Sequence, residues 1–262
     1  MIELNKIYNK DCLYGLKLLE DSYVDLTVTS PPYDDLRSYN GYSFEFEKIA
    51  QELYRVTKPG GVIVWIVSDR TKNGSETGTS FRQALYFKDI GFNLHDTMIY
   101  EKNNPTPQKS NRYQPCFEYM FILSKGKPKT FNPIMIEKKY IESRPNKMYN
   151  KDKSGMQIQH QYSSSSNLKI KNNIWKYNVG LYHSTNDKEA FKHPAIFPEQ
   201  LATDHIISWS NPGDIVLDPF MGSGTVAKMA LILNRNFIGF EISDGYCKLA
   251  KERVEKYVGQ MG

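Results

Sequence analysis

The sequence has few cysteines and no pattern of metal-binding residues. It contains three cysteines, at positions 12, 116 and 247, which are odd in number and widely spaced. It has no Cys-x-x-Cys pair and no cluster of His and Cys. A disulfide framework and a zinc site are therefore not indicated, and we expect no bound metal.

Long hydrophobic segments are also missing. Residues 1–6 lack the apolar stretch of a signal peptide. The longest apolar run, Val62 to Val67, is much shorter than the roughly 20 residues of a membrane-spanning helix. We therefore expect a soluble, cytoplasmic protein with no membrane partner.

The charge is only slightly unbalanced. The chain has 34 Lys and Arg against 29 Asp and Glu, a net charge of +5, which permits a nucleic-acid partner without requiring one. A hydrophobic content of 40% and an aromatic content of 13% indicate a globular protein. The 262 residues suffice for one large domain or for a domain with an insert.

Apolar segments that read as strands alternate with segments of helical spacing. The predicted strands are 2–8, 23–28, 62–67, 91–100, 117–123, 215–218 and 237–242, and the predicted helices are 13–19, 46–56, 80–87, 199–209, 225–233 and 246–257. Strands that are apolar throughout are typical of a sheet covered on both faces. This alternation predicts an α/β fold with a mainly parallel central sheet.

One stretch, residues 125–188, differs in composition from the rest. It is polar and basic, with scattered aromatic residues and little periodicity. It reads either as a solvated insert or as a surface that follows phosphates and reads bases. We therefore divide the chain into residues 1–124, the insert 125–188, and residues 189–262, which complete the first domain.

A stiff corner follows the predicted strand 23–28. Its sequence is Ser30-Pro31-Pro32-Tyr33, and each proline fixes its own φ and keeps the preceding residue extended. The Ser30 hydroxyl and the Ser30 and Pro31 carbonyls can then point outward beside the Tyr33 ring. Such acceptors next to an aromatic face suit a planar amine, although a simple strand-to-loop corner with a packed tyrosine would have the same sequence.

A glycine turn follows the predicted strand 215–218. Asp218-Pro219-Phe220 leads into Gly222, Gly224 and Thr225, and the next strand ends at Glu241 and Ile242. Strand, glycine turn, helix, strand and acid is a nucleoside-binding order. Because it also fits the looser NAD fingerprint, an NAD-dependent oxidoreductase or a non-catalytic nucleotide-binding protein stays an alternative. The acid and the aromatic residue at the strand tip favour a sulfonium nucleoside with an amino-acid tail.

Together these motifs resemble the amino-methylating DNA methyltransferases that use S-adenosyl-L-methionine. Their order, with the Pro-Pro-Tyr motif first and the cofactor motif last, resembles the permuted beta subgroup of that family. The resemblance implies a Rossmann-like methyltransferase fold in which residues 125–188 recognise the target. It implies that Asp11 contacts the adenine amino group, that Glu241 binds the ribose, and that residues 192–198 close over the methionine end. The cofactor-binding residues that follow are Asp11, Cys12, Asp218, Pro219, Phe220, Gly222, Gly224, Thr225, Glu241 and Ile242.

Asp11 and several other polar or aromatic residues also have plain structural interpretations. Asp11 is a plausible N-cap of the helix that follows it. Arg37 and Tyr39 fit a contact with an extruded nucleotide or an ordinary loop. His193 fits a contact with the cofactor or a structural turn, and Phe197 fits the cofactor or the core.

The catalytic residues implied by the resemblance are Ser30, Pro31, Pro32 and Tyr33. Ser30 Oγ and the Pro31 carbonyl would accept the two amine hydrogens while Tyr33 stacks on a base flipped out of double-stranded DNA. Serine at the first motif position resembles the cytosine-N4 enzymes, whereas aspartate is usual for adenine N6. We therefore expect cytosine N4, with adenine N6 as the alternative. The resemblance also implies a restriction-modification system, and it is compatible with a homodimer and with a cognate restriction endonuclease that acts separately.

Overall fold

The computed structural model describes most of the chain in two compact units. The first unit comprises residues 1–132 and 173–262, and the second comprises residues 133–172. Within them the described residues are 2–32, 44–105, 107, 111–138, 146–151, 154–162, 167–180, 184–185, 187, 189–190, 193 and 197–258. No described helix is both long and apolar enough to cross a membrane.

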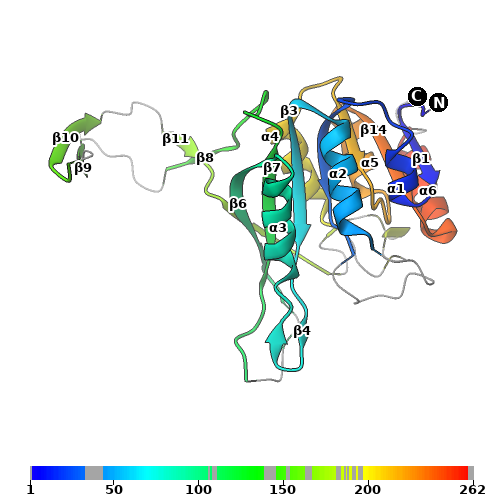
Figure 1. The fold of residues 1–262 in the computed structure, drawn as a ribbon, viewed down its shortest axis with the longest axis horizontal. Coiled ribbons are helices and arrows are strands. Elements are labelled where there is room, and N and C mark those ends of the chain that lie inside the picture. The colour runs from blue at the N-terminus through cyan, green and yellow to red at the C-terminus, as the bar shows by residue number, and fades with distance from the viewer. Residues whose placement is uncertain are drawn as a thin grey trace. The chain divides into compact units, whose positions relative to one another are not determined.

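An eight-stranded sheet organises the first unit, in the order β1-β14-β13-β2-β3-β7-β6-β12 (Figure 1). Its strands are β1 (Lys6–Asn9), β2 (Val24–Thr29), β3 (Thr57–Val67), β6 (Asn93–Lys102), β7 (Phe117–Ser124), β12 (Ile174–Tyr177), β13 (Ile215–Asp218) and β14 (Asn236–Glu241). Neighbouring strands are parallel except at β7, which is antiparallel to both β3 and β6. The expected mainly parallel sheet is confirmed.

Helices cover both faces of this sheet (Figure 1). The helices α1 (Cys12–Leu16), α2 (Phe46–Val56) and α3 (Thr79–Asp89) lie on one face, and α4 (Glu199–Trp209), α5 (Thr225–Ile232) and α6 (Asp244–Val258) lie on the other. In α2 the buried residues are the adjacent pair Ile49 and Ala50, followed at three- or four-residue spacing by Leu53 and Val56. Their spacing forms one apolar stripe that packs on the sheet.

Burial on both faces explains the composition of the central strand β3. Its residues from Val62 to Val67 are all buried, and the Trp65 indole donates a 2.9 Å hydrogen bond to Gln83 Oε1. The Phe87 ring packs edge-on against Trp65 at 5.2 Å between centroids, and Phe46 packs against both. This aromatic cluster fixes α2 and α3 on the sheet.

The strand order reverses between β13 and β2. From β13 the chain passes through α5 to β14 on one side, whereas from β2 it passes through α2 to β3 on the other. In an open parallel sheet such a switch point leaves a crevice at the carboxyl ends of the two strands, where ligands bind. The Ser-Pro-Pro-Tyr corner and the glycine turn follow these same two strands.

Two smaller sets of strands complete the description. In the second unit, β8 (Met135–Glu137) pairs with β11 (Leu168–Ile170) and β9 (Asn146–Lys151) pairs with β10 (Gln157–Tyr162), all antiparallel. In the first unit, β4 (Thr71–Lys72) and β5 (Ser75–Glu76) form a short hairpin after β3. Strand β12, which lies within the expected insert 125–188, pairs with β6 of the main sheet. The role of 125–188 in target recognition stays a prediction.

Candidate active site

A buried hydrogen bond joins the ends of β2 and β13. The Thr29 hydroxyl donates to Asp218 Oδ1 at 2.7 Å, and both side chains are buried. Since Ser30 follows Thr29 directly, the structure brings the first part of the proline corner next to the strand that leads into the glycine turn. Pro31 is buried and Ser30 and Pro32 are half-buried. Tyr33, Arg37 and Tyr39 lie outside the described residues.

Asp218 has an unusual protonation equilibrium. Burial raises the pKa of its carboxyl to about 7, although the Thr29 hydroxyl and the Phe220 amide lower it by donating hydrogen bonds. The charge of Glu241 raises the pKa further. Burial also raises the pKa of Glu241 itself. The ends of β13 and β14 therefore carry two poorly solvated carboxyl groups, and the charge of Glu241 disfavours ionisation of Asp218.

The glycine turn is held by Glu241 and covered by His193. Gly222 and Gly224 have φ of +52° and +81°, in the left-handed region that favours glycine. Glu241 Oε2 accepts a 2.8 Å hydrogen bond from the Gly222 amide. A Cβ on Gly222 would lie 3.2 Å from His193 Nε2, and the His193 ring packs on Tyr246 at 4.3 Å between centroids.

Asp11 lies beside the end of β14. Asn9 pairs with Glu241 in the sheet, and the Lys10 amide donates to the Glu241 carbonyl at 3.0 Å. Asp11 Oδ1 accepts from the amides of Leu13 and Tyr14 at 2.9 and 3.3 Å, so the expected N-cap is confirmed. A contact between Asp11 and the cofactor stays a prediction.

The other predicted cofactor residues divide between the core and the rim of the crevice. Cys12 and Pro219 are buried, and burial raises the pKa of the Cys12 thiol. The half-buried Phe220 ring packs on Phe44 at 5.7 Å between centroids. Ile242 and Phe197 are half-buried as well, whereas residues 192 and 194–196 lie outside the described part of the chain.

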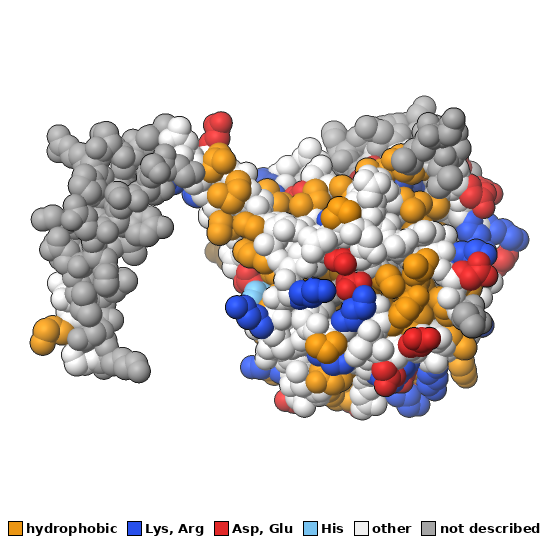
Figure 2. All heavy atoms as spheres, turned by 90° about the horizontal axis from the view of Figure 1, so that it is seen from above, with side chains coloured by type: hydrophobic (Ala, Val, Ile, Leu, Met, Phe, Trp, Pro, Cys, Tyr) orange, Lys and Arg blue, Asp and Glu red, His pale blue; other side chains and the backbone are white. Residues whose placement is uncertain are grey.

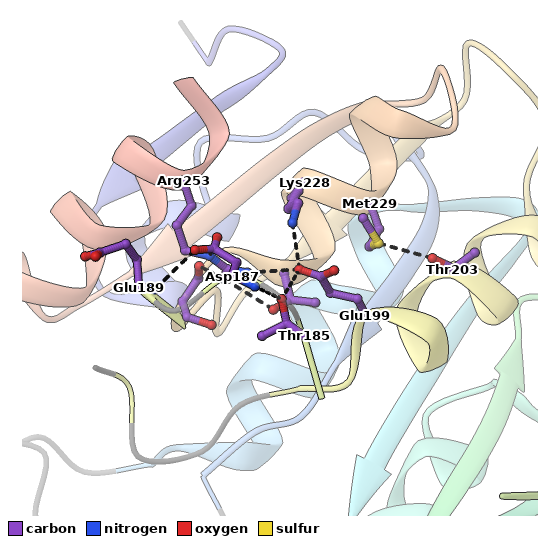
Figure 3. Close-up of polar contacts among 10 residues, drawn as sticks. Thr185, Asp187, Glu189, Glu199, Thr203, Lys228, Met229 and Arg253 are labelled. Atoms are coloured by element: carbon purple, nitrogen blue, oxygen red, sulfur yellow. Dashed lines mark hydrogen bonds and ion pairs between the residues drawn. The ribbon is translucent and has the colours of Figure 1, made fainter. Parts of the chain in front are cut away.

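Sequence reasoning missed a buried cation, Arg253, which bonds to the glycine turn and to the acids Asp187 and Glu199 (Figure 3). The Arg253 side chain is 1% exposed and donates to the Ser223 carbonyl, and its Nε lies 2.7 Å from Asp187 Oδ2. Its second terminal nitrogen lies 3.2 Å from Glu199 Oε1, which also accepts from Lys228 at 2.8 Å. These residues are far apart in the sequence, and Arg253 has the spacing of an ordinary polar helix residue, so no sequence pattern singled it out.

The donors and acceptors of the crevice indicate the kind of ligand that fits. The Gly222 amide is used by Glu241 and the Gly224 amide by the Met221 carbonyl, so neither points freely at a pyrophosphate. The carboxyl groups of Asp11, Asp218 and Glu241 are suited to hydroxyl, amino and ammonium donors. Among the described residues, no group of three or more His, Cys, Asp and Glu is placed to hold a metal ion. An S-adenosylmethionine-like nucleoside therefore fits better than NAD.

Comparison with known proteins identifies the family. Residues 24–252 match the model of the N6/N4 methyltransferase family, described as DNA methylase. The chain belongs to this DNA methylase family. It is 58% identical over 248 residues to the orphan methyltransferase M.BamHII of Bacillus amyloliquefaciens, covering 91% of each chain. It is 31% identical to the type II methyltransferase M.BglII of Bacillus subtilis, covering 94% of this chain and 68% of that one.

Two solved structures resemble this DNA methylase in fold. The structure of M1.HpyAVI in complex with SAM has a TM-score of 0.61 and 26% identity, and the match covers 95% of this chain and 98% of that one. The cytosine-N4-specific PvuII DNA methyltransferase has a TM-score of 0.68 and 19% identity, with coverages of 97% and 91%. The expected Rossmann-like methyltransferase fold is confirmed. Family membership leaves no support for the NAD-dependent oxidoreductase alternative.

Proposed function

We propose that this DNA methylase transfers the methyl group of S-adenosyl-L-methionine to the exocyclic N4 of cytosine in double-stranded DNA. The observation that carries the proposal is the Thr29–Asp218 hydrogen bond, because it sets the Ser30 corner beside the glycine turn. A base amine held at the Ser30 corner would meet a cofactor held at the glycine turn.

The acids of the crevice are the groups that would hold the cofactor. Glu241 stands at the end of β14, where a carboxylate can accept hydrogen bonds from ribose hydroxyls. Asp11 lies beside Glu241 and would accept a hydrogen bond from the adenine amino group of the cofactor. Asp218 precedes the glycine turn, which would face the amino-acid end of the cofactor. S-adenosyl-L-methionine supplies an activated methyl group on its sulfonium sulfur.

The proline corner would activate the base by positioning. The lone pair of an exocyclic amine is delocalised into the ring, so the amine is a weak nucleophile. Ser30 Oγ and the Pro31 carbonyl accept its two hydrogens, which turns the lone pair toward the methyl group, while Tyr33 stacks on the ring. The base must leave the duplex to reach this corner. Ser30 acts as a hydrogen-bond acceptor and not as a covalent nucleophile.

Adenine N6 is the second candidate, since a serine hydroxyl can accept a hydrogen bond from either amine. The test is mass analysis of nucleosides from DNA that has been incubated with the protein and S-adenosyl-L-methionine, against a reaction without cofactor. We expect N4-methylcytosine. Methyladenine without methylcytosine would show that adenine, not cytosine, is the target base. The absence of both methylated bases would overturn the proposed function.

The biological partners follow from the same proposal. A restriction-modification role fits relatives that are named type II methyltransferases, whereas M.BamHII is named an orphan methyltransferase. A separately acting endonuclease and a homodimer therefore stay predictions. We assign target recognition to residues 125–188, because their polar and basic composition suits phosphate contacts and base readout.

A further inference from the structure

A short hairpin extends β3 past the end of its neighbour β2. Thr29, the last residue of β2, pairs with Trp65, whereas β3 continues to Val67 and then leads into β4 and β5. Asn73 and Gly74 at the hairpin tip have φ of +51° and +79°. These angles are typical of the two-residue type I′ turn, whose twist matches that of the strands it joins.

A second segment runs along this hairpin and is tied to it. It is the connection from β6 to β7, residues 103–116, of which 103–105, 107 and 111–116 are described. Arg112 donates a hydrogen bond to the Gly74 carbonyl, and its other terminal nitrogen lies 3.9 Å from Glu76 Oε1. We call the hairpin, residues 69–78, and the described residues of this connection the arm. Figure 1 shows it projecting from the sheet at the tip of the β3 arrow.

The base of the arm is anchored to α3. Asp69 Oδ1 accepts from the Ser80 amide at 3.0 Å and from the Thr77 hydroxyl at 3.2 Å, and the Ser80 hydroxyl donates to the other carboxylate oxygen. Since β2 and β3 are parallel neighbours, the arm rises from the same edge of the sheet as the Ser30 corner. It therefore stands where a duplex must approach to deliver a base.

The chemistry of the arm suits nucleic acid. Lys72 is exposed and forms no salt bridge with any described residue, and the Tyr113 ring is fully exposed. Phe81 and Phe117, 49% and 42% exposed, continue this aromatic surface at its base, where each packs on Tyr119. The two carboxylates of the arm, Asp69 and Glu76, are engaged by Ser80 and Arg112. At the opposite ends of the strands, Lys and Arg side chains are likewise interspersed with Asp and Glu (Figure 2).

We propose that the arm is a DNA-contacting element that grips the duplex beside the extruded base, with Lys72 on a backbone phosphate and the Tyr113 ring on an unstacked base or its sugar. This inference rests on the proposed function and adds a second contact surface to it, outside residues 125–188. The exposed lysine gives attraction without sequence readout, and the exposed ring offers a stacking surface that any base can use.

The test measures binding of the full chain to a mixed-sequence duplex by fluorescence anisotropy over a series of salt concentrations. For Lys72→Ala we expect weaker binding and a slope of log K against log salt that is smaller by about 0.9, the effect of one lost phosphate contact. For Tyr113→Ala we expect several-fold weaker binding with an unchanged slope, and Tyr113→Phe should retain the affinity. Lys88→Ala is the matched control, because Lys88 is exposed in the last turn of α3, which leads to the start of β6 at the opposite end of the strands.

Three results would overturn the arm as a DNA contact. The first is that Lys72→Ala and Tyr113→Ala both bind the duplex with the affinity of the unchanged chain. This result would count against the arm even if the unchanged chain methylates DNA. The second is a change in oligomeric state on sedimentation with unchanged DNA affinity, which would make the arm a protein contact. The third is an unchanged chain that does not bind duplex DNA at all. In contrast, unchanged DNA binding without methylcytosine or methyladenine counts against the proposed function alone.

Discussion

Thr29 and Asp218 are 189 positions apart in the sequence, and their side chains form a buried 2.7 Å hydrogen bond at the carboxyl ends of β2 and β13. The bond stabilises the ionised form of Asp218, because a hydroxyl donor lowers the pKa that burial raises. It also holds together the two strand ends on which the proposed reaction depends.

Replacing Thr29 by Val should weaken this junction. The change keeps the shape of the side chain but removes one of the two hydrogen-bond donors of the buried Asp218 carboxyl and leaves only the Phe220 amide. We therefore expect a loss of about 1.5–3 kcal/mol in the free energy of unfolding and a higher pKa for Asp218. Urea unfolding measures the loss. Thr27→Val on the same strand is the control, because the buried Thr27 hydroxyl has no hydrogen-bond partner in the described part of the chain. Equal losses in the two variants would contradict this account.

The raised pKa of Asp218 makes a prediction about pH. With a value of about 7 in the folded chain, against about 3.9 for an unfolded aspartate, the folded chain holds a proton that the unfolded chain has released between these pH values. The free energy of unfolding should therefore fall as the pH rises from about 4 to 7, by on the order of 4 kcal/mol from this group. Asp218→Asn should remove this component from the unfolding profile. An identical pH dependence in the variant would show that Asp218 is ionised throughout.

The glycine turn should not tolerate a side chain at Gly222. A Cβ there would meet the His193 ring at 3.2 Å, and alanine would be held at a φ of +52°. We expect Gly222→Ala to weaken binding of S-adenosylhomocysteine at least tenfold by titration calorimetry. Gly213→Ala provides the comparison, because Gly213 also has a positive φ, +88°, but a Cβ there has nothing within 4 Å. The backbone strain in Gly213→Ala should lower the free energy of unfolding and leave the affinity for S-adenosylhomocysteine unchanged.

Arg253 should act on the cofactor turn through Ser223. Arg253→Lys keeps the charge but cannot reach Ser223, Asp187 and Glu199 together, so we expect weaker S-adenosylhomocysteine binding. We expect Arg253→Met to cost about 3–5 kcal/mol of stability, since it leaves Asp187 without its ion-pair partner, whereas Glu199 keeps Lys228. Burial raises the pKa of Asp187, but the hydrogen bond and charge of Arg253 outweigh it and hold that pKa below the usual value. The loss in Arg253→Met should therefore shrink as the pH falls through the pKa of Asp187, and a loss independent of pH would contradict the ion pair.

Tyr33 should affect chemistry and not cofactor binding. If its ring stacks on the extruded base, Tyr33→Ala should lower the rate of methyl transfer by a factor of ten or more while S-adenosylhomocysteine binds as before. Tyr33→Phe keeps the ring and should keep most of the rate. Methylation by Tyr33→Ala at the rate of the unchanged chain would remove the stacking role.

Periodicity and end signals in the sequence predicted much of the fold. The expected helices 46–56 and 199–209 have the observed bounds of α2 and α4, and Asp11 caps α1 as expected. These elements are long or capped, and their apolar spacing is set by one buried face, which is a local property of the chain. The two motifs at the switch point were predictable for the same reason, since each has its own local sequence.

Other features depended on contacts between distant residues. The reversed direction of β7 has no local sequence signal, because a buried strand is apolar in either orientation. Strand β12 is four residues long and alternates in burial within a polar segment, so the sequence did not predict the strand or its pairing with β6. Asn73-Gly74 did carry a hairpin signal that the sequence reasoning did not use. The bonds of Arg253 unite residues whose proximity arises only in the folded chain.

The strand order of the sheet also governs how the chain can fold as it is synthesised. Strand β2 lies between β3 and β13, and β1 joins the sheet through β14, so both N-terminal strands need partners from the last fifth of the chain. Until residues 215–241 leave the ribosome, β2 presents an unpaired apolar edge to other chains. Truncation before Ile215 should therefore give an aggregating product, because the strands that pair with β1 and β2 would be missing.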